Sequence, residues 1–132
     1  MSYLIRQISE ITGLPASTLR YYEKEHLLPA VKRNENGNRI YEDQDLDWIS
    51  IITCLRDTNM PIMDIKKFVA LCALGDSTLE ERRALIVAHK HSVEKQMSVL
   101  QGHMKHIDHK INYYNIACKA GTEAVVKGKK CT

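Results

Sequence analysis

The sequence predicts a mainly α-helical protein in which a winged helix-turn-helix is followed by a long coiled-coil helix. Three patterns support this fold class: two short helical segments around Gly13, a hairpin signal at Asn36-Gly37, and an apolar repeat with alternating spacings of three and four residues that runs to Cys118. We expect the winged helix-turn-helix in residues 1–75, the coiled-coil helix in residues 76–120 and a flexible tail in residues 121–132.

The composition limits the possible functions. The 132 residues have a hydrophobic fraction of 44%, and their formal net charge of +3 does not by itself indicate a nucleic-acid partner. No apolar run approaches the length of a membrane span and no leader-like segment opens the chain, so we expect a cytoplasmic protein without a membrane partner. Because no phosphate-binding loop or nucleophile–base pattern is visible, we predict neither an enzyme with catalytic residues nor a bound cofactor.

The first segments predict two helices joined by a turn. Tyr3-Leu4-Ile5 is a short apolar start that suits a strand or the lead-in to a helix, and one amphipathic segment covers residues 8–14, with Gly13 near its end. Pro15 suits the first position of the second helix, which must end before Pro29 because the residue before a proline disfavours helix. The inward face of this second helix is expected to carry Leu19, Tyr22 and His26.

The other face of the second helix is polar and aromatic. Its side chains share one side through spacings of three and four residues, and they are Ser17, Arg20, Tyr21 and Lys24. A hydroxyl, a guanidinium, a phenol and an ammonium are groups that bind phosphates and base edges of nucleic acids. The face therefore predicts a DNA-contacting helix.

Residues 31–41 predict a two-stranded wing. Asn36-Gly37 favours a two-residue hairpin turn, which requires positive φ at both positions. The strands carry Lys32, Arg33 and Arg39 against a single acidic residue, Glu35. This basic bias, directly after a helix-turn-helix, favours a phosphate-contacting wing over a solvated loop.

The rest of the chain predicts three more helices. Residues 43–58 form the third, Pro61 starts the fourth, and a capping box from Ser77 to Glu80 starts a helix that continues to Ala120. The seam of this last helix, interrupted only by Lys90, consists of Ile86, Val93, Met97, Leu100, Met104, Ile107, Ile111, Tyr114 and Cys118. A lone helix cannot bury such a seam on itself, so we expect a partner helix, most simply from a second copy in a homodimer.

These residues resemble the MerR family of bacterial transcription regulators. The likeness is carried by Thr18-Leu19-Arg20-Tyr21-Tyr22-Glu23, Leu27-Leu28, Arg33, Gly37, Arg39 and Tyr41. The resemblance implies a winged helix-turn-helix DNA-binding domain, an antiparallel coiled-coil dimerisation helix, and a promoter with an overlong spacer. It also implies that the activated protein distorts this spacer so that RNA polymerase engages both promoter elements.

The resemblance also implies which residues contact double-stranded DNA. The family's DNA-contact positions map onto Ser17, Thr18, Arg20, Tyr21, Lys32, Arg33, Arg39 and Tyr41. The sequence departs from the family pattern at His26, where glycine is usual, and at Asn38, where an aromatic residue is frequent.

Within the family, Cys54 and the short segment after the long helix are similar to the aldehyde- and thiol-stress-responsive subgroup, in which this cysteine is the effector-sensing residue. Two readings of Cys54 stay open, a sensor thiol and a buried structural thiol. Arg56 and Lys66 would favour a thiolate if the fold brings them near.

Two alternatives to a stress-responsive regulator remain. A metal-responsive regulator of the same family would pair cysteines in a short loop, but Cys118 and Cys131 lie too far apart, and His103 with His106 is more simply a solvated helix face; we expect no metal. An effector-free DNA-architectural protein would share the winged head, but proteins of that kind lack a long dimerisation helix.

Overall fold

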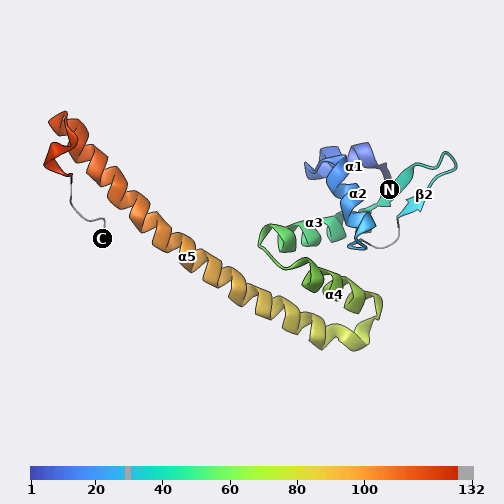
Figure 1. Cartoon of the computed structure of the whole chain (residues 1–132). Helices are drawn as coiled ribbons and strands as arrows, with labels where there is room; N and C mark the ends of the chain where they lie inside the picture. Colours follow the sequence, from blue (N-terminus) through green and yellow to red (C-terminus); the bar gives the residue numbers. More distant parts are fainter. Residues whose placement is uncertain (29–30, 128–132) are drawn as a thin grey trace. The chain divides into compact units, whose positions relative to one another are not determined.

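The computed structural model describes residues 1–28 and 31–127, and Figure 1 shows their helices and strands. The chain divides into two compact units, Met1–Val87 and the residues from Ala88 onward. The sequence prediction placed the first boundary after residue 75, whereas the first turns of the long helix pack with the N-terminal unit.

The N-terminal unit contains the predicted helix-turn-helix and wing. Its elements in chain order are β1 (Ser2–Leu4), α1 (Ile5–Thr12), α2 (Ala16–Lys24), β2 (Lys32–Arg33), β3 (Arg39–Glu42), α3 (Asp43–Asp57), α4 (Ile62–Ala73), a 3-10 helix (Asp76–Thr78) and the start of α5 (Leu79–Ala120). The prediction of a mainly helical chain with a small wing and a long C-terminal helix is confirmed.

The turn between α1 and α2 is stabilised by local hydrogen bonds. Gly13 has φ of 74°, a left-handed conformation that glycine adopts without steric cost, and its N–H donates to the Ser9 carbonyl at 2.9 Å. The Ser9 hydroxyl donates to the carbonyl of Leu14. Pro15 has an extended backbone and caps α2, one position earlier than predicted, because Ala16 is the first helical residue.

The wing is a three-stranded antiparallel sheet in the order β1-β3-β2. The first strand, left open between strand and helix lead-in by the sequence, pairs with β3 so that Tyr3 lies opposite Tyr41. On the other side of β3, Arg33 lies opposite Arg39. The chain's first residues therefore complete the wing.

The wing turn differs from the predicted two-residue hairpin. Residues 34–38 connect the strands, and positive φ occurs at Gly37 but not at Asn36. The Asn34 side-chain carbonyl accepts from the N–H groups of Asn36 and Asn38, both at 3.0 Å. The Asn34 side chain thus organises the loop, so a longer turn needs only one left-handed residue.

The C-terminal end of α2 is a Schellman motif. The Leu27 N–H donates to the Tyr22 carbonyl at 2.8 Å, and the His26 N–H donates to the Glu23 carbonyl at 3.1 Å. His26 takes the left-handed position with φ of 57°, while Leu27 is buried. The prediction that His26 packs inward is wrong, because its side chain is exposed and only its backbone closes the helix.

The end of α3 repeats this arrangement and completes the core. The Met60 N–H donates to the Leu55 carbonyl at 2.9 Å, and Asn59 takes the left-handed position with φ of 67°. The buried core is formed by side chains from α1 to α4, from β3 and from the segments that follow α2 and α3, and it consists of Ile8, Leu19, Tyr22, Leu27, Leu28, Tyr41, Ile49, Ile52, Leu55, Met60 and Ile65.

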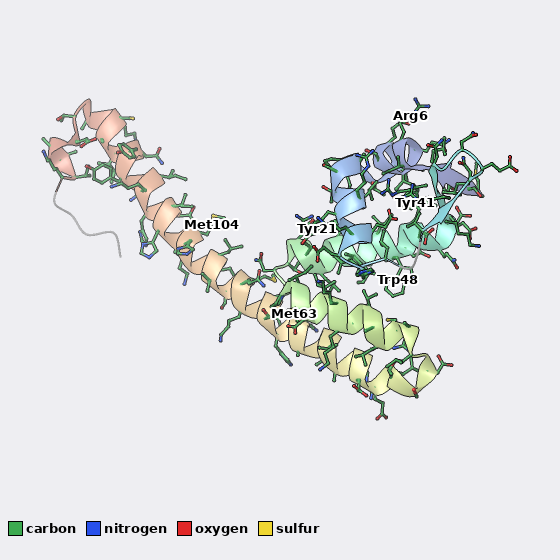
Figure 2. All side chains as sticks on the ribbon, turned by 45° about the vertical axis from the view of Figure 1, so that its right-hand side comes forward. Arg6, Tyr21, Tyr41, Trp48, Met63 and Met104 are labelled. Atoms are coloured by element: carbon green, nitrogen blue, oxygen red, sulfur yellow. The ribbon has the colours of Figure 1, made fainter. Side chains whose placement is uncertain are left out.

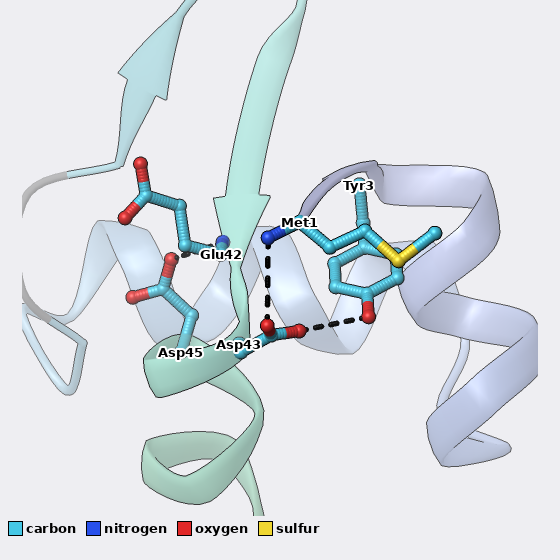
Figure 3. Close-up of polar contacts among 5 residues, drawn as sticks. All are labelled: Met1, Tyr3, Glu42, Asp43 and Asp45. Carbon is cyan, nitrogen blue, oxygen red and sulfur yellow. Dashed lines mark hydrogen bonds and ion pairs between the residues drawn. The ribbon is translucent and has the colours of Figure 1, made fainter.

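The start of α3 is tied to the N-terminal strand (Figure 3). The Tyr3 hydroxyl donates to the Asp43 carboxylate at 2.8 Å, and the amino group of Met1 lies 3.5 Å from the same carboxylate. The Asp45 carboxylate accepts from the Glu42 N–H at 2.8 Å and caps the helix. The hydrogen bond from Tyr3 lowers the pKa of Asp43, and the same bond raises the pKa of Tyr3.

The turn from α4 to α5 is held by Thr78 and Arg82. The buried Thr78 hydroxyl lies 2.6 Å from the Leu71 carbonyl and 2.9 Å from the Gly75 carbonyl. The Arg82 guanidinium donates to the Gly75 carbonyl at 2.8 Å and to the Thr78 hydroxyl at 3.0 Å. The anchoring hydroxyl is therefore one residue after Ser77, where the sequence predicted the cap.

The long helix α5 is about 63 Å long at about 1.5 Å per residue. The predicted seam, from here on the apolar stripe, is exposed over most of its length: Met97, Leu100 and Met104 are 56%, 65% and 56% exposed. Apolar side chains in such a row leave a large surface in water, which indicates a missing partner.

The chain turns back after α5. The Thr122 N–H donates to the Ala117 carbonyl at 3.1 Å, a short 3-10 helix covers Glu123–Val125, and Val126 is buried. Residues 121–127 of the predicted flexible tail thus pack on the helix end, and residues 128–132 lie outside the described part of the chain. Within the described residues, no helix has the length and apolarity needed to span a membrane.

Candidate nucleic-acid interface

The polar face of α2 lies on the surface as predicted. Ser17, Arg20 and Lys24 are exposed, and Tyr21 is 39% exposed. Thr18 is half-buried beside them, while Leu19 and Tyr22 on the opposite face are completely buried. Burial of the apolar face fixes the rotation of α2, so the polar groups must point outward.

The basic residues of the wing differ in their exposure and in their partners. Lys32 and Arg33 are exposed on β2, and the Arg33 guanidinium donates to the Gly37 carbonyl at 2.8 Å. Arg39 on β3 is half-buried and forms an ion pair with Glu23 of α2. Arg39 therefore fastens the wing to α2 and is less free for phosphates than the sequence predicts.

A pocket of about 370 Å³ lies between α1, α2 and the wing. Four arginines line it, together with backbone and apolar atoms: Arg6, Arg20, Arg33 and Arg39. In the described part of the chain, Arg6 and Arg20 form no ion pair, so Glu23 is the one acidic partner of this group. Arginine favours phosphate groups as partners, so this hollow is a candidate anion-binding site.

Arg6, which Figure 2 shows on α1, is not among the DNA-contact residues predicted from the sequence. It lies outside the matched motif and precedes the segment whose amphipathic pattern was read as the first helix. The signal that could have found it is the three-residue strand before it: once β1 joins the wing, the first turn of α1 must lie beside the wing's basic residues.

Tyr41 is the one member of the predicted DNA-contact set that the structure buries. Its side chain is 0% exposed, and burial raises the pKa of its hydroxyl. Among the described residues the Tyr41 hydroxyl has no hydrogen-bond partner. Residues two apart in a strand share one face, so Tyr41 and Arg39 both point to the helix side of β3. This side chain therefore positions the wing and cannot touch DNA as it lies.

Cys54 is exposed on α3, which excludes the reading of a buried structural thiol. The two cations expected to activate it are engaged elsewhere. The Arg56 guanidinium lies over the Tyr21 ring, 5.6 Å from its centroid, and Lys66 pairs with Glu25 at 2.9 Å, an interaction that lowers the pKa of Glu25.

The other cysteines have different surroundings. Cys72 is half-buried, with its sulfur 4.0 Å from the Arg82 guanidinium, and Cys118 is exposed on α5. Cys131 lies outside the described residues. Across residues 1–28 and 31–127, no three histidine, cysteine or acidic side chains lie close enough together to hold a metal ion.

Comparisons with known proteins agree on one family. The sequence pattern of the MerR HTH family of regulatory proteins matches residues 3–71. An HTH-type transcriptional regulator of Haemophilus influenzae is 38% identical over 126 residues, covering 96% of this chain and 93% of the relative. The regulator AdhR of Bacillus subtilis is 39% identical over 82 residues, covering 62% of this chain and 59% of AdhR.

Solved structures show the same fold. The crystal structure of HiNmlR, described as a MerR family regulator lacking the sensor domain and bound to promoter DNA, has a TM-score of 0.88 at 38% identity, covering 96% of this chain and 100% of HiNmlR. A MerR family regulator from Bacillus thuringiensis has a TM-score of 0.78 at 36% identity, covering 85% and 98% of the two chains.

Proposed function

This chain belongs to the MerR family of helix-turn-helix transcriptional regulators, and from that premise we propose that it binds promoter DNA as a homodimer, distorts the promoter spacer and responds to aldehyde or thiol-reactive stress. The relatives are transcriptional regulators and not enzymes. The proposed site of action is the cytoplasm, where RNA polymerase and promoter DNA meet.

One observation supports DNA binding above the others: the polar face of α2 and the arginine-lined pocket lie on the same unit. The exposed side chains of α2 suit base edges, while four guanidinium groups suit backbone phosphates. The head of this chain therefore provides both kinds of contact that a sequence-specific protein needs. The likeness to HiNmlR, whose crystal contains promoter DNA, supports the same use of this surface.

We assign the contacts as follows. Ser17, Thr18, Arg20 and Tyr21 approach the major groove, and Lys32, Arg33 and Arg6 contact phosphates. Arg39 holds the wing on α2 and turns its remaining donors to the pocket, and Tyr41 supports the wing from the core. Two such heads on a stiff dimer would bend and untwist the DNA between them, so part of the binding energy is used to deform the spacer.

Replacement of Arg20 by alanine should weaken operator binding by about 1–3 kcal/mol if the guanidinium reads a base. Arg6→Ala should weaken specific and nonspecific DNA alike and reduce the salt dependence, because it removes one phosphate contact. Mobility shifts at two or more salt concentrations measure both effects. Lys119→Ala, which removes one exposed positive charge from the last turn of α5, is the control. Unchanged affinity in both arginine variants contradicts the proposed interface.

Cys54 is the proposed sensor. Its exposure allows an electrophile to reach the sulfur. Addition of the thiol to an aldehyde forms a carbon–sulfur bond and moves the thiol proton to the carbonyl oxygen. The added group would lie on α3, the helix whose Arg56 guanidinium covers the rings of Tyr21 and Tyr22 in α2, at 5.6 and 5.9 Å from the ring centroids. A change on α3 can therefore reach the DNA-reading helix.

The Cys54→Ser variant should bind the operator normally and lose its response to formaldehyde, methylglyoxal and diamide in a promoter-reporter assay. Variants with Cys118 and Cys131 replaced by serine should respond as the wild type does. Zinc serves as a separate inducer: a zinc response that depends on Cys118 or Cys131 would favour a metal-responsive regulator. A full response of Cys54→Ser to every thiol-reactive inducer would sink the sensor assignment.

A further inference from the structure

Glu23 holds one arginine of the arginine-lined pocket. Its carboxylate accepts from the Nε–H of Arg39, and the two side chains are 25% and 24% exposed. Because a partly buried ion pair is screened by salt less than a surface pair, this contact persists in the free protein at physiological ionic strength. In the described part of the chain, the other three guanidinium groups of the pocket have no carboxylate partner.

The pairing of Glu23 with Arg39, and not with Arg20, depends on the tertiary structure. Arg20 precedes Glu23 by three residues in α2, a spacing at which an arginine and a glutamate can pair along a helix. Glu23 pairs across to β3 instead, and Arg20 has no ion pair among the described residues. The wing arginine is therefore held, whereas the arginine on the polar face of α2 stays available for DNA.

The ion pair occupies only part of the Arg39 side chain. A guanidinium has five N–H donors in a planar fork, and the carboxylate accepts from the one at Nε. Glu23 therefore fixes the direction of the remaining donors, and its negative charge repels phosphates that approach from its own side. Four guanidinium groups and one carboxylate give this site a net charge of +3.

Resting on the proposed binding of promoter DNA, we propose that Glu23 is a specificity-determining residue, because its pairing with Arg39 weakens binding to DNA of any sequence more than binding to the operator. Phosphate contacts carry no sequence information and supply almost all nonspecific affinity. A held guanidinium can donate to a phosphate at one position, which the base contacts of α2 select in the operator complex. A released guanidinium follows a phosphate wherever it lies, so its release favours nonspecific DNA.

The Glu23→Gln variant tests this role. The amide oxygen can still accept from Arg39, but a neutral acceptor holds a guanidinium less strongly than a carboxylate does. Affinity for a scrambled duplex should rise roughly five- to tenfold per head at about 0.1 M salt, and the slope of log affinity against log salt should steepen by about 0.9 per head, as for one more phosphate contact. Operator affinity should change much less, so the ratio of the two affinities falls.

Fluorescence anisotropy over a series of salt concentrations measures both affinities. The operator duplex is selected with the wild-type protein from a pool of random duplexes, and the scrambled duplex has the same length and composition. If the ion pair has only a structural role, Glu23→Gln should melt at a lower temperature and bind both duplexes more weakly. That result, or an unchanged slope and ratio, overturns the proposal.

The Glu25→Gln variant is the matched control. Glu25 caps the end of α2, and its carboxylate pairs at 2.9 Å with Lys66 of α4, outside the arginine-lined pocket. The substitution removes the same charge, so a general electrostatic effect on DNA binding would appear in both variants. We expect Glu25→Gln to change the salt slope and the affinity ratio far less than Glu23→Gln does, and equal effects overturn the proposal.

Addition of Arg39→Gln to Glu23→Gln tests whether Glu23 acts through Arg39. The double variant returns the site to a net charge of +3, so the salt slope for the scrambled duplex should return to the wild-type value. A slope that stays steep means that the added phosphate contact comes from another residue, and it overturns the role of Arg39.

The outcomes also separate this inference from the proposed function. A wild-type protein that selects no sequence from the random duplexes contradicts the proposed function, and the specificity role of Glu23 fails with it. A wild-type protein that binds its operator, combined with a Glu23→Gln variant of unchanged slope and ratio, overturns the role of Glu23 alone.

Discussion

At the scale of single residues, His26 stands out because its backbone is left-handed. Most residues with a β-carbon lose roughly 1–2 kcal/mol in this conformation, whereas glycine adopts it freely. His26 must keep its positive φ, because this conformation allows the N–H groups of His26 and Leu27 to donate to the last carbonyls of α2. Asn59 takes the same position after α3 with a residue type that tolerates it better.

The His26→Gly variant should therefore raise the free energy of unfolding by about 0.5–1 kcal/mol, the relief of strain being partly offset by the greater freedom of glycine in the unfolded chain. Urea unfolding at fixed protein concentration measures the change, and operator affinity should stay the same. His109→Gly, in the exposed middle of α5, should instead lose about 1 kcal/mol. A His26→Gly variant with a lower free energy of unfolding than the wild type would contradict the assignment of His26 as a strained left-handed residue.

The candidate site was predictable where it depends on helix spacing. Ser17, Arg20 and Tyr21 share a face because of the helical repeat, and the structure exposes that face. Tyr41 could not be placed in the same way, since its burial depends on which side of β3 the helices cover. The pairing of Arg39 with Glu23 likewise depends on two segments that meet only after folding.

At the scale of elements, the contact of β1 with α3 is sensitive to pH. The Tyr3 hydroxyl lowers the pKa of Asp43, so the folded state favours the ionised carboxylate. A group with a lowered folded pKa stabilises the protein above its unfolded pKa, about 3.9 for aspartate, and this contribution is lost as the pH falls through the folded value.

Tyr3→Phe should therefore destabilise the protein at pH 7, and its difference from the wild type should shrink below about pH 4. Urea midpoints between pH 7 and pH 3 measure this, and the pKa of Asp43 by NMR should move up toward its ordinary value in the variant. An equal difference at pH 7 and at pH 3 would show that the hydroxyl acts through packing and not through the carboxylate.

The sequence predicts which segments form the α-helices, but it does not predict several of their boundaries or the pairing of the strands. Periodicity and proline positions are local signals, so the helices of the head and α5 follow from them. The pairing of β1 with β3 joins residues about 40 positions apart, and no local pattern contains it. The wing turn was mispredicted because Asn34 supplies side-chain hydrogen bonds that the Asn36-Gly37 signal ignores.

At the scale of the whole molecule, the exposed apolar stripe of α5 predicts a dimer interface. Leu100→Glu places an unpaired carboxylate in the seam of each copy, and a buried unpaired charge costs several kcal/mol. The variant should be monomeric in light scattering and should no longer bind a palindromic operator. Lys105→Glu, outside the stripe, should remain dimeric. A dimeric Leu100→Glu variant would mean that the stripe is not the interface.

The exposed stripe also makes the state of the protein depend on its concentration in the cell. When the folded form of a segment exists only with its partner, the law of mass action links its melting temperature to protomer concentration. Diluting the protein should lower the melting temperature of α5 more than that of the winged head, whose core closes within one chain. A cell that makes few copies would therefore hold folded heads with unpaired long helices. The abundance of the regulator would then decide what fraction of it can engage both halves of an operator.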